Sequence, residues 1–74
     1  MKKFKTSDLA LAAYMVTFGM KLIEAKRLPS GRFDFELDDS DDKSQQLSID
    51  FINSDFCRFD NNIKLLKKML YSDK

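Results

Sequence analysis

Residues 20–37 read MKLIEAKRLPSGRFDFEL, and this stretch decides the fold. Pro29 presets the backbone angle that the second position of a turn needs, and Gly31 supplies a positive φ angle after it. The second half of the stretch alternates between apolar and charged side chains, as a half-buried strand does. Its apolar members are Phe33, Phe35 and Leu37. The stretch therefore predicts a β-hairpin, with strands in residues 20–27 and 32–37.

A helix is predicted immediately before the hairpin. Thr6, Ser7 and Asp8 form a helix-start signal, because a Ser or Thr side chain can accept a hydrogen bond from a free backbone N–H group and Asp8 suits the positive end of the helix dipole. Gly19 is the matching stop signal. Residues 9–18 are apolar nearly all the way round, and such a helix is either central or shared between subunits. We therefore expect a homodimer that forms through this first helix.

Acidic residues gather along the second hairpin strand and just after it. Their spacing invites a calcium interpretation, but the required pattern of oxygen ligands around a central Gly with a distal Glu is missing. Ser40 as a helix N-cap, with Asp41 and Asp42 in the first turn, explains the same residues. We expect no metal and no cofactor. Acidic patches on very small proteins can imitate nucleic-acid charge, so the candidate partner-binding residues are Asp34, Glu36, Asp38, Asp39, Asp41 and Asp42.

Residues 43–53 fit two patterns. Leu47, Ile49 and Phe51 alternate as in a strand, whereas Leu47 and Phe51 after an acidic cap suit a helix. We expect a helix. A third strand at residues 46–52, added to the hairpin, is the alternative.

The end of the chain predicts an amphipathic helix capped by Asp60. Its apolar residues recur at intervals of three and four: Phe59, Ile63, Leu66 and Leu70. Basic residues lie off this stripe and are the candidates for contact with nucleic acid: Arg58, Lys64, Lys67 and Lys68. A formal net charge of +1 and an acidic middle of the chain argue against a strong electrostatic grip on nucleic acid.

The residues needed for catalysis are scarce. The chain has no His, so Cys57, its only cysteine, lacks the base that would generate a thiolate. Its only two glycines, Gly19 and Gly31, are already explained as a helix stop and a turn, so no Gly-rich phosphate loop exists. We expect a protein that is not an enzyme.

Size and hydropathy limit the architecture further. A chain of 74 residues suits one domain, residues 1–74, with a small core that a second subunit can support. The apolar stretch at residues 9–18 is about half of the roughly 20 residues that span a bilayer. We expect a soluble cytoplasmic protein of the α+β class, with the order helix, β-hairpin, helix, helix (αββαα).

Three segments resemble a short uncharacterised domain family of bacteria and their phages. They are the opening FKTSDL of residues 4–9, the KLI of residues 21–23 after Gly19, and the closing IKLLK of residues 63–67. The resemblance spans nearly the whole chain and implies a helix, a hairpin and two helices. No site residues carry over, because the family has no assigned function.

The resemblance also implies a phage or prophage setting, in which small solitary domains commonly regulate or inhibit host machinery. We therefore expect a non-enzymatic phage-type binding protein that modulates or inhibits a host or defence protein complex. The alternative is a small nucleic-acid-binding regulator that uses the basic C-terminal helix.

Overall fold

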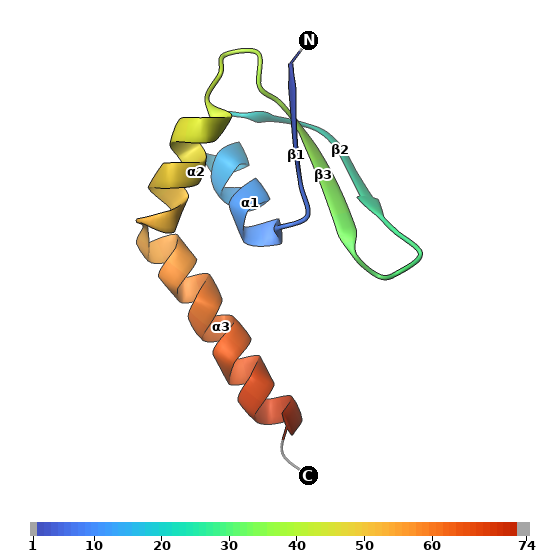
Figure 1. Cartoon of the computed structure of the whole chain (residues 1–74), viewed down its shortest axis with the longest axis vertical. Helices are drawn as coiled ribbons and strands as arrows, with labels where there is room; N and C mark the ends of the chain where they lie inside the picture. Colours follow the sequence, from blue (N-terminus) through green and yellow to red (C-terminus); the bar gives the residue numbers. More distant parts are fainter. Residues whose placement is uncertain (1, 73–74) are drawn as a thin grey trace.

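A computed structural model describes residues 2–72 of the chain (Figure 1). The predicted α+β class and the predicted order of helix, hairpin and two helices are confirmed, and one short strand precedes them. The elements are β1 (Lys3–Thr6), α1 (Leu9–Thr17), β2 (Lys21–Arg27), β3 (Phe33–Asp38), α2 (Ser44–Ile52) and α3 (Asp55–Ser72).

The three strands form one antiparallel sheet in the order β1-β3-β2. Leu37 in the central strand pairs with Phe4 on one side and Leu22 on the other. The alternative of a third strand at residues 46–52 is wrong, because these residues lie in α2. The third strand is β1 instead.

The predicted turn between β2 and β3 is confirmed. The N–H group of Gly31 donates a hydrogen bond of 2.9 Å to the carbonyl of Leu28, and the N–H group of Leu28 donates one of 2.7 Å to the carbonyl of Arg32. Gly31 has a φ angle of 90°, which favours glycine over residues with a side chain.

Both predicted ends of the first helix are confirmed. The Asp8 carboxylate accepts a hydrogen bond of 3.1 Å from the N–H group of Leu11 and so caps α1. The chain leaves the helix at Gly19, with a φ angle of 106°, and the N–H group of Met20 donates to the Met15 carbonyl at 2.9 Å. This is the geometry of a glycine-terminated helix.

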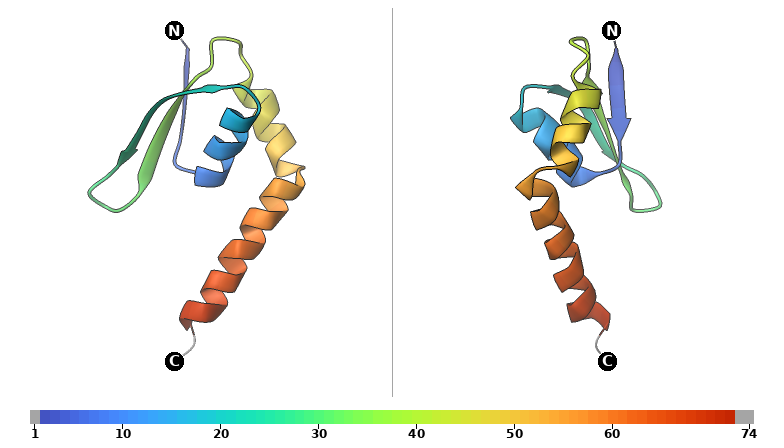
Figure 2. Two further views of the ribbon diagram at one scale, coloured as in Figure 1. Left: turned by 180° about the vertical axis from the view of Figure 1, so that it is seen from behind. Right: turned by 60° about the vertical axis from the view of Figure 1, so that its left-hand side comes forward.

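The core lies between α1 and one face of the sheet. Met15 of α1 and Leu37 of β3 are fully buried, and Met20 packs with them. α2 lies against the other side of α1 (Figure 2), where buried Phe51 meets the Tyr14 ring edge-on at a centroid distance of 5.4 Å. Four partly buried residues complete the core: Phe4, Leu11, Phe35 and Leu47.

α3 runs away from this core (Figures 1 and 2), and the molecule measures 49 × 31 × 15 Å. The predicted start of this helix at Asp60 is wrong, because α3 begins at Asp55. Ser54 accepts a 3.3 Å hydrogen bond from the N–H group of Cys57 and so caps the helix, in place of Asp60. Across residues 2–72, none of the helices combines the length and the apolar character needed to cross a membrane.

Candidate functional site

The six predicted acidic residues lie along β3 and the turn that leads from it to α2. They follow one another along the chain, with Asp34, Glu36 and Asp38 in the strand and Asp39, Asp41 and Asp42 in the turn. On the face of the sheet turned away from α1, the Glu36 carboxylate lies 3.9 Å from the Nζ atoms of both Lys3 and Lys5. Asp34 is exposed on the same strand, opposite Lys26 of β2.

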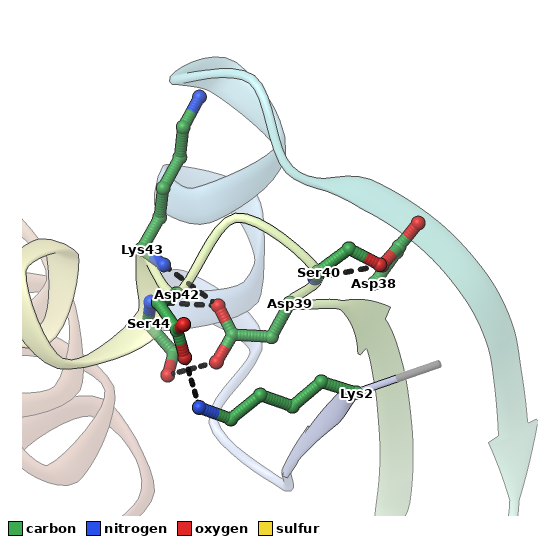
Figure 3. A network of polar contacts seen from close by, with 7 residues as sticks. All are labelled: Lys2, Asp38, Asp39, Ser40, Asp42, Lys43 and Ser44. Atoms are coloured by element: carbon green, nitrogen blue, oxygen red, sulfur yellow. Dashed lines mark hydrogen bonds and ion pairs between the residues drawn. The ribbon is translucent and has the colours of Figure 1, made fainter.

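Asp39 holds the start of α2 (Figure 3) and is only 4% exposed. Its Oδ1 accepts hydrogen bonds from the N–H groups of Lys43 at 2.8 Å and Ser44 at 3.0 Å, and its Oδ2 accepts from the Ser44 hydroxyl at 2.5 Å. The Ser44 hydroxyl is the main cause that holds the pKa of Asp39 below its usual value. The predicted N-cap at Ser40 is wrong, since Ser40 donates to the Asp38 carboxylate instead.

The remaining acidic residues lie in the turn before α2. Asp42 has a φ angle of 55° and forms an ion pair with Lys2, which raises the pKa of that lysine (Figure 3). Asp41 is exposed. Much of the acidic charge is thus bonded within the chain, and a role for these residues in partner binding stays a prediction.

The basic residues of α3 are spread around the helix. Arg58 forms an ion pair of 3.2 Å with Asp55, and Lys64 forms one of 2.9 Å with Asp60. The hydrogen bond that Lys64 donates to the Asp60 carboxylate is the main cause that raises the pKa of Lys64. Lys68 is exposed.

Two of these basic residues meet a third from the hairpin. Lys64 and Lys67 line an open hollow of about 520 Å³ together with Arg32, which follows the turn of the hairpin. Arg32 also donates a hydrogen bond of 3.3 Å to the hydroxyl of Ser7. The hollow lies at the start of α1, and two acidic residues also line it: Asp8, which caps α1, and Asp60, which pairs with Lys64.

An apolar hollow, here called the hairpin pocket, opens beneath the end of the hairpin. It encloses about 390 Å³ and is lined by Leu9, Ala25, Lys26, Arg27, Phe33 and Phe35. The two phenylalanine rings stack at a centroid distance of 6.2 Å, and Cζ of Arg27 lies 6.0 Å from the centroid of the Phe33 ring. The sequence identified this face of the hairpin as apolar, and the structure leaves its outer end uncovered.

A second apolar hollow, here called the helix groove, runs between α1 and α3. It encloses about 280 Å³. The α1 wall contains the small residues Ala10, Ala13 and Thr17 beside the larger Leu9 and Tyr14, and the α3 wall contains Phe56, Phe59 and Ile63. The Tyr14 ring bridges the two helices and meets Phe56 at a centroid distance of 5.8 Å.

The predicted apolar stripe lies on α3 and continues the wall of the helix groove along the helix. Because α3 begins at Asp55, Phe56 extends the predicted stripe by one position, and the seam, as it is called here, consists of Phe56, Phe59, Ile63, Leu66 and Leu70. The sequence does not reveal that the seam lies largely outside the core. Leu66 is 60% exposed and Leu70 is 74% exposed.

The side chains with metal-binding or nucleophilic chemistry are dispersed. Within residues 2–72, no group of three or more His, Cys, Asp or Glu residues is placed to hold a metal ion. Cys57 is half-buried in the first turn of α3, 3.9 Å from Nδ2 of Asn61.

The chain belongs to the family described as Domain of unknown function (DUF5659), whose sequence model matches residues 1–72. The predicted resemblance to an uncharacterised domain family is thus confirmed. No curated protein and no solved structure matches the chain significantly.

Proposed function

We propose that this member of the DUF5659 family is a non-enzymatic binding protein that modulates or inhibits a host or defence protein complex. It works in the cytoplasm of the host cell, in the phage or prophage setting that the resemblance implies. The hairpin pocket is the surface that holds the partner. The observation that carries the proposal is the pair of stacked phenylalanines with an arginine above them, left open at the end of the sheet.

The composition of the hairpin pocket suits a protein partner. Aromatic residues and Arg are enriched at the centres of protein interfaces, where they supply most of the binding energy. Phe33 and Phe35 already stack on each other, and Arg27 lies over the outer ring. These side chains therefore lose little conformational freedom when a partner arrives.

The charge around the hairpin pocket defines the chemistry of the partner. Arg27 lies over the Phe33 ring at the pocket, and Arg32 follows in the turn. Basic groups around an apolar hollow select a segment that combines an apolar side chain with neighbouring carboxylates. The partner is therefore a protein with an exposed acidic segment that carries an apolar anchor.

A pull-down from a bacterial host lysate, with nuclease present, tests this proposal. We compare the wild-type chain with Phe33→Ser and Arg27→Glu. Lys21→Glu is the matched control, because Lys21 is an exposed basic residue at the opposite end of the same strand. We expect one protein complex to be retained by the wild type and by the control, and to be lost with either pocket variant.

Two outcomes contradict the proposal. Equal retention by all four chains would place the contact elsewhere, and an Asp34→Asn, Asp41→Asn variant would then test the exposed acidic residues. Retention of nothing but nuclease-sensitive nucleic acid would exclude a protein partner.

A nucleic-acid-binding regulator is the second candidate. It is favoured by the convergence of Arg32, Lys64 and Lys67 from two separate elements on one hollow. Phosphate contacts make affinity fall steeply as salt rises. For this function we expect Lys64→Glu with Lys67→Glu to abolish nucleic-acid binding in a gel-shift titration, and a salt-independent affinity would exclude it.

A further inference from the structure

We propose that a second copy of this chain covers the seam, with the two α3 helices packed side by side in antiparallel orientation. The C-terminal half of each α3 then lies along the helix groove of the other copy. This contact goes beyond the proposed partner site, because the helix groove and the hairpin pocket share Leu9 alone among their lining residues.

The exposed surface of the chain is larger than a compact monomer allows. A folded monomer of 8.6 kDa is expected to expose about 4,700 Å². This chain exposes 5863 Å². The excess of roughly 1,200 Å² is of the size that one subunit buries in a stable protein interface, for which about 800 Å² per partner is standard. The radius of gyration agrees, at 14.0 Å against about 11 Å for a compact chain of this length.

The seam has the pattern of a helix that packs on another helix along its length. Its residues recur at intervals of three and four, which places them at alternating a and d positions of a heptad. The C-terminal half of α3 extends beyond α1 (Figure 1), and the outer seam residues Leu66 and Leu70 are exposed. The α3 helix of a second copy carries the same seam, and its length therefore matches.

The charges beside the seam select the antiparallel orientation. With the seam at a and d, Asp60 and Lys67 occupy e positions, and Asp55 occupies a g position. In an antiparallel pair with Ile63 opposite the partner's Leu66, Asp60 lies beside the partner's Lys67, and symmetry repeats this ion pair. A parallel pair would instead place Asp55 beside the partner's Asp60, which is repulsive.

The same register fills the helix groove. It sets Phe59 opposite the partner's Leu70, at the end of α3 that borders α1. The other wall of the groove there contains Ala10, Ala13 and Thr17, whose small side chains let a helix approach closely. The apolar end of one α3 thereby covers the apolar groove of the other copy.

Sedimentation equilibrium over a range of protein concentrations tests the dimer. We expect a mass of twice the 8.6 kDa of one chain. Leu66→Asp should weaken dimerisation on the order of 100-fold or more, since the lost anchor occurs twice in the interface. Leu65→Asp is the matched control, because Leu65 is its neighbour on α3 and is 57% exposed, yet lies outside the seam.

Both substitutions place Asp at an exposed position of α3, so they should change the stability of the helix to a similar degree. A difference between Leu66→Asp and Leu65→Asp therefore reports on dimerisation and not on misfolding. We expect Leu65→Asp to change the dissociation constant less than threefold. Far-UV circular dichroism checks that both variants keep their helices. A monomer at every concentration, or a dimer that Leu66→Asp and Leu65→Asp weaken equally, overturns the proposal.

A charge exchange tests the antiparallel register. Lys67→Glu and Asp60→Lys should each weaken the dimer about tenfold, and the double variant should regain most of that loss. Lys68→Glu makes the same charge change away from the seam and should have little effect. A double variant weaker than either single variant, or equal effects of Lys67→Glu and Lys68→Glu, excludes this register.

Discussion

Replacing Asp39 with Ala tests the view that this buried carboxylate, and not the exposed acids around it, holds α2 in place. The substitution removes three hydrogen bonds, from the N–H groups of Lys43 and Ser44 and from the Ser44 hydroxyl. Loss of a helix cap typically costs about 1 kcal/mol, and one hydrogen bond to a charged acceptor has a net contribution of about 1.5–3 kcal/mol; the three bonds share one carboxylate, so their contributions do not add in full. We expect the free energy of unfolding to fall by about 2–3 kcal/mol.

Urea unfolding followed by far-UV circular dichroism measures this loss. A domain of this size has a free energy of unfolding of about 5 kcal/mol and a slope of about 1 kcal/mol per molar urea, so the midpoint should fall by about 2–3 M. All samples need one protein concentration, because a dimer is more stable at higher concentration. Asp41→Ala is the control, since Asp41 is exposed in the same turn. A midpoint for Asp39→Ala within 0.5 M, by the same approximate scale, of that of Asp41→Ala would refute the reasoning.

Three further perturbations test the fold with the same assay. The pKa of Asp39 is lower in the folded chain than its unfolded value of about 3.9, so the ionised carboxylate stabilises the fold above that pH. The difference in unfolding free energy between the wild type and Asp39→Asn should therefore shrink as pH falls from about 5 to 2, and a constant difference contradicts this. Leu37→Ala should cost about 3 kcal/mol because Leu37 is fully buried, whereas Leu65→Ala should cost less than about 0.5 kcal/mol, and similar costs would contradict the assignment of the core. Gly19→Ala should cost about 1–2 kcal/mol because Gly19 has a φ angle of 106°, and a neutral effect would exclude backbone strain as the reason for glycine here.

The hairpin was predictable because its signals are local. Pro29 and Gly31 lie in the turn itself, and the alternation that follows needs no partner to be recognised. β1 offers no such signal, since a strand of four residues is too short for a clear alternation. It exists because Phe4 pairs with Leu37, and that pairing joins segments far apart in the sequence.

The ambiguity at residues 43–53 has a similar cause. Leu47 and Phe51 fit a strand and a helix equally well, and the decision depends on the cap. The sequence offered Ser40 as that cap, whereas the structure uses Asp39, four residues before Lys43. Asp39 follows the end of β3 and caps α2 across the turn that joins the two elements. This cap could not be predicted without the conformation of that turn.

The sequence predicted a partner site from charged residues, yet much of the charge on the predicted acidic residues is bonded within the chain. The open apolar surfaces follow instead from unequal lengths. α1 has nine residues and is about 13 Å long, whereas β2 has seven and extends about 23 Å, and α3 has 18 and extends about 27 Å. α1 is too short to cover either the hairpin or α3 along its full length. The end of the hairpin therefore extends beyond α1 on one side, and the end of α3 extends beyond it on the other. The Asp8 and Gly19 signals fix the length of α1 in the sequence, and that length is the clue from which both open surfaces could have been inferred.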